Sequence, residues 1–249
     1  MPVIIGARIT AERSLAPSPR ELHYVACSLL ETSDAEARHA GQDKPFTIWP
    51  LQPAAGPCGL HWVLRVGWVR ADPPAPATLS LDKLRVGHVN CVVTETMSRS
   101  ATHAQLAAGP VQAEAELTFG SPTYFSHNGS TLLTPDPRRM TDSWRRSWNT
   151  WLPEPSELRI SDETGQEISK TVELADFELR TVTGASGYGR DQAGFVGSVR
   201  LRLGRGASSD ARAAFSALAR FAEFCGTGAQ TTHGFGATRS GSGSGSGEW

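Results

Sequence analysis

The sequence has few lysines, few cysteines and no long hydrophobic run, and each shortage excludes a class of protein. Only three of its 24 basic residues are lysines, at positions 44, 83 and 170. A formal net charge of −1 over 249 residues excludes a globally basic nucleic-acid binder, although it is compatible with a local patch of arginines. The four cysteines stand far apart without a C-x-x-C pair, so the sequence predicts neither a zinc site nor a disulfide framework.

Other absences bear on location and chemistry. No apolar run approaches the roughly 18 residues of a membrane span, and Arg8 follows the first apolar residues too early for a secretory signal. We therefore expect a soluble cytoplasmic protein without membrane contact. The chain has no Walker or G-x-S-x-G motif and no pair of histidines at helical metal-ligand spacing, so we expect no metal and no cofactor.

Hydrophobic patterning predicts an α+β protein whose two halves repeat one plan. In the first half we expect strand 3–10, helix 20–32, strand 46–51, strand 60–69, helix 81–86 and strand 88–97. In the second half we expect strand 111–125, helix 137–151, strands 172–182 and 195–203, helix 210–225 and a final strand into Thr238. This order suggests two ferredoxin-like domains, 1–108 and 109–239, followed by a flexible Gly/Ser tail at 240–249.

Two pairs of glycines follow the last predicted helix. They are Gly226, Gly228, Gly234 and Gly236, and the residues between them include Gln230, Thr231, Thr232 and His233. Glycines expose backbone N–H groups and let another backbone come close, so a polyanion is a natural partner of this loop, with the polar residues as side-chain donors. The alternative is a tight helix-to-strand connection without a ligand.

The predicted helix 137–151 carries tryptophans on one face and arginines elsewhere. Met140, Trp144, Trp148 and Trp151 recur at helical spacing, which favours a buried core over a platform for stacking bases. The densest positive positions of the whole sequence are Arg138, Arg139, Arg145, Arg146, Arg200, Arg202 and Arg205. Each is either a contact to a polyanionic partner or a solvated or ion-paired surface charge, and we expect at most half of them to touch such a partner.

His39 differs from most other histidines of the chain, which fall on predicted strands or in polar turns. It lies in a polar loop, five residues before Lys44 and the Pro-Phe-Thr that follows it. A neutral imidazole there could act as a general base while the lysine stabilises developing negative charge. An exposed loop histidine without function is the alternative.

Three blocks stand in order along the chain: HAGQDKPFTIWPL at 39–51, FGSPTYFSHNG and LLTPDPRRMTDSWRRSWN between 119 and 149, and GTGAQTTHGFG at 226–236. Together they resemble the CRISPR repeat-processing endoribonucleases of the repeat-associated mysterious protein (RAMP) superfamily. The resemblance implies two tandem ferredoxin-like, RRM-like domains and metal-independent cleavage of precursor CRISPR RNA within each repeat. In that reaction the ribose 2′-hydroxyl attacks the adjacent phosphate and leaves a 2′,3′-cyclic phosphate and a 5′-hydroxyl.

The resemblance also assigns roles to residues. His39 matches the catalytic histidine of the family, and Lys44 matches its lysine before P-F-T. Glu31 stands where many members have a tyrosine, Tyr24 lies one helical face earlier, and His23 is the alternative base because some relatives carry the histidine on the first helix. The implied partner is CRISPR repeat RNA, with other effector-complex subunits as further partners. Two other functions stay open: a non-catalytic RNA-binding subunit of the same superfamily, and a protein-interaction module whose glycine loop is only a turn.

Overall fold

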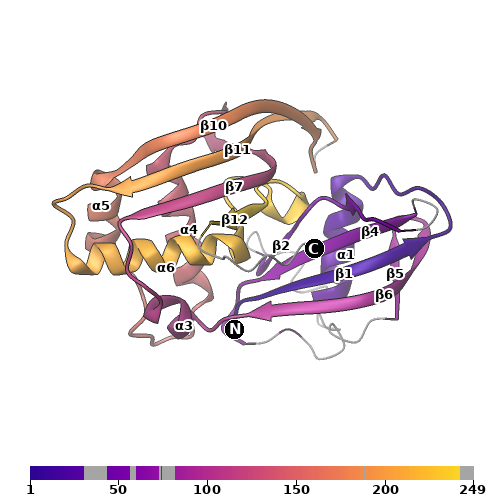
Figure 1. The fold of residues 1–249 in the computed structure, drawn as a ribbon, viewed down its shortest axis with the longest axis horizontal. Coiled ribbons are helices and arrows are strands. Elements are labelled where there is room, and N and C mark those ends of the chain that lie inside the picture. The colour runs from indigo at the N-terminus through magenta and orange to yellow at the C-terminus, as the bar shows by residue number, and fades with distance from the viewer. Residues whose placement is uncertain (31–43, 57–59, 73, 75–81, 188, 242–249) are drawn as a thin grey trace.

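The computed structural model describes residues 1–30, 44–56, 60–72, 74, 82–187 and 189–241, which form two lobes side by side (Figure 1). Each lobe consists of an antiparallel sheet packed against helices. The strands before residue 101 build the lobe drawn in indigo and magenta, and most of the later chain builds the other. The α+β class expected from the sequence is therefore confirmed.

As far as its residues are described, the first lobe is a six-stranded sheet with one helix. Its elements are β1 (Val3–Ala11), α1 (Pro19–Leu30), β2 (Phe46–Ile48), β3 (Gln52–Pro53), β4 (His61–Trp68), β5 (Lys83–Val86) and β6 (Val89–Ser100). The strand order is β2-β4-β1-β6-β5, with β3 beside β4, and all pairs are antiparallel. Helix α1 buries Leu22, Val25, Ala26 and Leu30 against the sheet, which is the apolar stripe of an amphipathic helix.

The second lobe is a four-stranded sheet with longer helices. Its elements are α3 (His103–Ala108), β7 (Glu114–Thr123), β8 (Phe125–His127), β9 (Ser130–Leu132), α4 (Pro137–Trp151), α5 (Asp162–Thr171), β10 (Val172–Ala185), β11 (Asp191–Leu203), α6 (Ser209–Cys225), the 3-10 turn η3 (Thr231–His233) and β12 (Thr238–Ser240). The strand order is β10-β11-β7-β12, and β8 and β9 form a separate hairpin. Helix α3 packs against α6 and buries Leu106 in the core of the second lobe, so residues 103–108 lie in the second lobe although the predicted boundary assigns them to the first domain.

Local chemistry explains where α4 and α6 begin and end. The Asp136 carboxylate accepts from the N–H groups of Arg138 and Arg139, and Pro137 occupies the first turn. Ser208 caps α6 by accepting from the Ala211 N–H, and Gly226 ends it with a φ of +69°.

The core of the second lobe forms around α4. Met140, Trp144 and Trp148 are almost completely buried there, as the sequence predicted. Trp151 is only half-buried, and it packs at the edge of this core. The tryptophan stripe therefore reaches the surface at its C-terminal end.

The segment 81–86, expected as a helix, contains strand β5 instead. Leu84 and Val86 are buried while Lys83 and Arg85 are exposed, which is the alternation of a strand. Gly87, with a φ of +58°, closes the hairpin to β6. Pairing with β6 therefore determines the conformation of this segment, and the expectation of a helix is wrong. Helices α3 and α5, the short strand β3 and the small β8–β9 hairpin were not expected at all.

The two lobes meet where β2 and β4 contact the end of α6. A Cβ atom added to Gly67 would lie 2.4 Å from the carbonyl oxygen of Phe224, so the two backbones touch there. The Thr47 hydroxyl donates to the same oxygen at 3.1 Å. Val69, which directly follows β4, is buried in the core of the second lobe. This seam fixes the position of β2 relative to α4 and α6.

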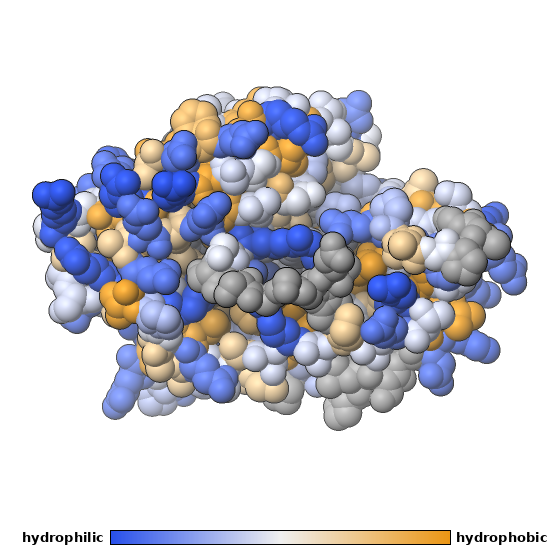
Figure 2. Space-filling model, viewed as in Figure 1, coloured by the Kyte–Doolittle hydropathy of each residue, from blue (hydrophilic) through white to orange (hydrophobic). Residues whose placement is uncertain are grey.

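The surface is mixed in character. Figure 2 shows hydrophilic side chains over much of both lobes in the orientation of Figure 1, with hydrophobic ones interspersed. Among the large apolar side chains, Tyr24 and Phe177 are the most exposed, at 71% and 61%. No helix within the described ranges is long and apolar enough to cross a membrane.

Candidate active site

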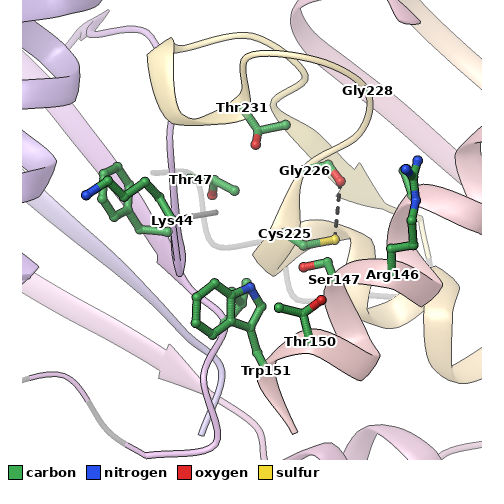
Figure 3. A pocket seen from close by; sticks show the side chains of 13 residues that line it. Lys44, Thr47, Arg146, Ser147, Thr150, Trp151, Cys225, Gly226, Gly228 and Thr231 are labelled. Atoms are coloured by element: carbon green, nitrogen blue, oxygen red, sulfur yellow. Dashed lines mark hydrogen bonds between the residues drawn. The ribbon is translucent and has the colours of Figure 1, made fainter. Parts of the chain in front are cut away.

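A pocket of about 380 Å³ lies at the seam between the two lobes (Figure 3). Four segments build it: the start of β2, the end of β4, one face of α4, and the end of α6 with the glycine loop that follows. Its lining residues are Lys44, Phe46, Thr47, Val69, Ser143, Arg146, Ser147, Thr150, Trp151, Cys225, Gly226, Gly228 and Thr231. The fold thus brings Lys44 and the glycine loop, which are more than 180 positions apart in sequence, to one cavity.

The lining has the chemistry of an anion site. Lys44 and Arg146 are its two charged residues, and they lie on opposite sides of the cavity (Figure 3). Among the described residues that line it, none is a carboxylate and five carry hydroxyl groups. Burial raises the pKa of the Cys225 thiol, so this thiol stays neutral and adds no negative charge. A phosphodiester with its ribose hydroxyls suits such a lining.

Positive φ angles shape the glycine loop. Gly226, Gly228, Gly234 and Gly236 all have φ between +66° and +91°, a region that disfavours other residues. Two of them also permit close backbone contacts. A Cβ on Gly228 would lie 2.4 Å from the Tyr124 carbonyl oxygen, and one on Gly236 would lie 2.0 Å from that of Thr227. These glycines are therefore required by the fold of the loop itself.

The amide groups of the loop are mostly used within the protein. Gly226 N–H donates to Ala222 at 2.8 Å, and Gly236 N–H donates to Pro122 at 3.1 Å. The expectation that the glycine pairs expose free N–H groups is thus wrong for Gly226 and Gly236, because the loop folds back on its neighbours. Both are buried, as is Gly234, whereas Gly228 and Thr231 are half-buried and line the pocket.

Gln230 holds the loop in place. It has a left-handed backbone with a φ of +57°. Its amide oxygen accepts from the Gly187 N–H at 2.9 Å, and its amide nitrogen donates to the Tyr124 hydroxyl. The loop is thereby tied to the β10–β11 connection and to the end of β7.

His23 and His233 form a stacked pair between α1 and the loop. Their ring centroids are 4.3 Å apart and their planes differ by 5°. His23 Nδ1 lies 2.9 Å from the Thr232 carbonyl oxygen, which can only accept, so Nδ1 carries the proton. His23 Nε2 lies 3.5 Å from Cys27 Sγ. Burial, followed by the charges of His23 and Arg20, lowers the pKa of His233 to about 4. The stacked pair therefore holds the glycine loop against α1.

Two of the predicted catalytic positions, His39 and Glu31, lie outside the described residues. Tyr24 and His23 lie on α1, and neither lines the pocket. Because both ring nitrogens of His23 already have neighbours in the protein, the alternative base is engaged in holding the loop.

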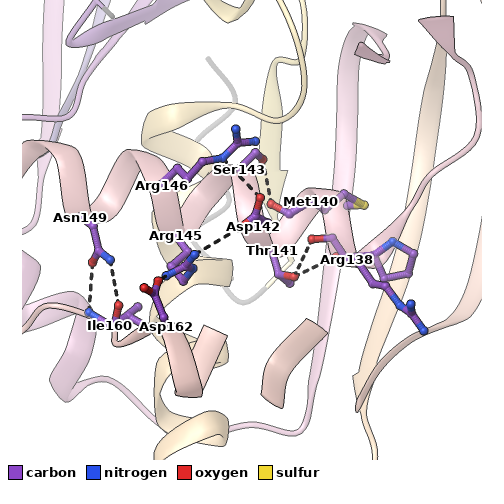
Figure 4. A network of polar contacts seen from close by, with 11 residues as sticks. Arg138, Met140, Thr141, Asp142, Ser143, Arg145, Arg146, Asn149, Ile160 and Asp162 are labelled. Atoms are coloured by element: carbon purple, nitrogen blue, oxygen red, sulfur yellow. Dashed lines mark hydrogen bonds and ion pairs between the residues drawn. The ribbon is translucent and has the colours of Figure 1, made fainter. Parts of the chain in front are cut away.

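Most of the predicted arginines on α4 are engaged in ion pairs (Figure 4). Arg145 contacts Asp162 at 2.7 Å and Asp142 at 3.5 Å, while Arg139 contacts Asp136 at 3.2 Å. Arg138 is exposed and does not line the pocket. Arg146 alone among these arginines lines the cavity, and its contact with Asp142 at 3.4 Å leaves 70% of its side chain exposed.

Arg200 and Arg202 point to a different surface. They lie on the exposed face of β11, where Arg200 pairs with Asp176 at 3.7 Å and Arg202 pairs with Glu114 at 2.7 Å. Glu116 and Glu178 line the hollow beside Arg200. Carboxylates on the same face disfavour a phosphate backbone, so this face differs from the pocket. Arg205, also predicted, is exposed in the turn after β11.

Sequence reasoning missed several pocket residues. Ser143, Ser147 and Thr150 recur at four- and three-residue steps along the face of α4 that lines the cavity. That spacing was visible, but a polar helix face is usually solvated and gave no reason to select it. Trp151 had been assigned to the core with the other tryptophans, and the structure places it at the pocket wall.

The part of the chain that the structure describes contains no group of three or more His, Cys, Asp or Glu side chains that could hold an ion.

Comparison with known proteins agrees with this geometry. The family model of the CRISPR-associated endoribonuclease Cas6 matches residues 117–238. A Thermus thermophilus Cas6 in a product complex superposes with a TM-score of 0.83 and 23% identity, covering 96% of this chain and 100% of its own. A second Cas6 in a product complex has a TM-score of 0.78 and 26% identity, covering 96% and 99%.

The same second protein in a substrate mimic complex gives a TM-score of 0.72 at 25% identity, again covering 96% and 99%. No curated protein sequence matches significantly. The tandem ferredoxin-like architecture expected from the sequence is therefore confirmed over nearly the whole chain.

Proposed function

The chain belongs to the CRISPR-associated endoribonuclease Cas6 family, and on that premise we propose that its inter-lobe pocket is the site where CRISPR repeat RNA is cut. The observation that carries the proposal is the meeting of Lys44, Arg146 and the glycine loop around one cavity, which has no carboxylate among its described lining residues. A scissile phosphate placed between the two cations is stabilised as negative charge develops on it.

The proposed reaction needs no metal. The 2′-hydroxyl next to the scissile phosphate loses its proton to His39 and attacks phosphorus. The bond to the 5′-oxygen breaks, and this oxygen takes up a proton to become a 5′-hydroxyl, which leaves a 2′,3′-cyclic phosphate on the other product. Nucleophile and leaving group belong to the RNA, so the protein supplies only position, a base and positive charge.

The pocket supports His39 as the base over His23. Lys44 lines the cavity and lies five residues after His39 in the chain, whereas His23 lies on α1 in the stacked pair with His233. In this proposal Lys44 stabilises the charged phosphate, and the glycine loop contributes another wall of the pocket through Gly228 and Thr231.

Single-turnover cleavage of the chain's own CRISPR repeat RNA in EDTA tests the proposal. His39→Ala is expected to lower the rate about 10²- to 10⁴-fold and Lys44→Ala about 10²- to 10³-fold, with binding retained. His88→Ala and Lys83→Ala are matched controls, because both residues are exposed at the β5–β6 hairpin. A 2′-deoxy nucleotide at the cut site should abolish cleavage by the unaltered protein.

Each other outcome contradicts a distinct part of the proposal. Tight binding without cleavage would favour a non-catalytic RNA-binding subunit. Loss of cleavage in EDTA with recovery in Mg²⁺ would contradict the metal-independent mechanism. Full activity of His39→Ala together with loss of activity in His23→Ala would identify His23, on α1, as the general base.

A further inference from the structure

Helix α4 presents two chemically different faces. One face buries Met140, Trp144 and Trp148 in the second core. The other lines the inter-lobe pocket with Ser143, Arg146, Ser147, Thr150 and Trp151, which recur at three- and four-residue steps over more than two turns. We call this second set the α4 stripe. A single helix therefore carries a cation, hydroxyl groups and an aromatic ring into the cavity in a fixed order.

The hydroxyl groups of the stripe differ in availability. Ser143 Oγ donates to the Met140 carbonyl within the helix at 2.8 Å, so its proton is used. The hydroxyls of Ser147 and Thr150 have no hydrogen-bond partner among the described residues, and Thr150 is exposed. Two adjacent hydroxyls that can donate and accept are suited to the polar edge of a ligand.

Trp151 stands at the end of the stripe with its position fixed from the other lobe. Its carbonyl oxygen accepts from the Ala71 N–H at 3.2 Å. The indole is half-buried, and Figure 3 shows it beside Thr150 at one wall of the pocket. The hydrogen bond fixes the main chain at Trp151, and the half-buried indole can offer its remaining surface to a planar group at little entropic cost.

We infer that the α4 stripe holds one unpaired nucleotide of the repeat, with its base stacked on Trp151, its polar edge at Ser147 and Thr150, and its phosphate at Arg146. Proteins read RNA sequence mainly through unstacked bases that lie on aromatic rings, and the pocket volume of about 380 Å³ falls in the range of small-ligand sites. This inference rests on the proposed function. It adds Trp151 as a residue that determines the sequence preference near the cut site.

The test is a double-mutant cycle between protein and RNA. A set of repeat RNAs, each with one abasic nucleotide near the cut, is bound to the unaltered protein, to Trp151→Leu and to Trp151→Phe. Stacking on aromatic side chains corresponds to about 5- to 150-fold in affinity per base. One abasic position should weaken binding of the unaltered protein by a factor in that range, and the same abasic change should have almost no effect on Trp151→Leu.

Trp151→Phe keeps an aromatic ring, so in this variant the abasic nucleotide should again weaken binding, by most of the factor seen with the unaltered protein. A purely structural role of Trp151 would not predict this result. Thermal unfolding of both variants separates lost folding from lost recognition. Ser147→Ala should reduce discrimination among the four bases at the same position. If Trp151→Leu and the unaltered protein show the same abasic profile while both cleave the repeat, the inference fails and the proposed function stands. If the unaltered protein neither binds nor cleaves the repeat, the proposed function itself fails.

Discussion

Replacing Gly236 by alanine tests whether the shape of the glycine loop depends on backbone contact. The residue has a φ of +66°, which costs an L-amino acid about 1–2 kcal/mol. In addition, the new Cβ would lie 2.0 Å from the Thr227 carbonyl oxygen, so one of the two segments must move.

Thr227 is poorly able to move. Its hydroxyl accepts from Trp144 Nε1 at 3.0 Å and from the Thr238 hydroxyl at 2.8 Å, and its N–H donates to Gly236 at 2.9 Å. Breaking one buried hydrogen bond and leaving a group unpaired costs about 1–3 kcal/mol. We therefore expect Gly236→Ala to lower the free energy of unfolding by about 2–5 kcal/mol, the sum of strain and lost bonding.

Gly129→Ala is the matched control. Gly129 has a φ of +78° in the turn between β8 and β9, but no atom lies within 4 Å of its Cβ position. It should lose only the strain, about 1–2 kcal/mol. Urea denaturation at 25 °C measures both variants, and cleavage of repeat RNA should fall more in Gly236→Ala because the loop lines the pocket. Equal losses of stability in the two variants would refute the reasoning from backbone contact.

The remaining predictions concern charge and protonation. Arg146→Gln should weaken RNA binding and lower the slope of log affinity against log salt by about 0.7–0.9, whereas Arg145→Gln should leave the slope unchanged because Asp162 and Asp142 engage that arginine. Arg200→Gln should likewise leave the slope unchanged, because carboxylates surround it; a reduced slope would instead assign RNA to the open sheet face. His103 is 4% exposed, and burial lowers its pKa to about 4, so the folded protein keeps it neutral. The stability that it contributes is complete above about pH 6.5 and is lost as the pH falls from 6.5 towards 4, by at most about 3 kcal/mol. His103→Phe should flatten this part of the pH–stability curve, and an unchanged curve would show that another group is responsible.

Helix α4 shows what the sequence could predict and what it could not. The Asp136-Pro137 start and the tryptophan spacing specify a helix with a buried face, and the structure confirms both. The opposite face looks solvated in sequence, because serine, threonine and arginine are ordinary surface residues. Only the packing of β2 and the glycine loop above that face turns it into a pocket wall, and no local pattern records this arrangement.

The glycine loop shows a second kind of limit. Its glycine spacing correctly indicated positive φ angles and close backbone approach. The spacing could not show whether a ligand or another part of the protein would approach the loop, since either close approach requires glycine. The carbonyl groups of Pro122 and Tyr124 occupy the places that a ligand could have taken. Likewise, residues 83–86 form a strand because they pair with β6, and their own composition does not specify that pairing.

The contact between Gly67 and Phe224 has a consequence for how RNA enters. Because main chain meets main chain there, side-chain rotation cannot change how closely β4 and the end of α6 approach each other beside the pocket. Under the proposed function, we expect this seam to favour repeat RNAs whose nucleotides at the cut are already unpaired over those that keep the same nucleotides in a duplex.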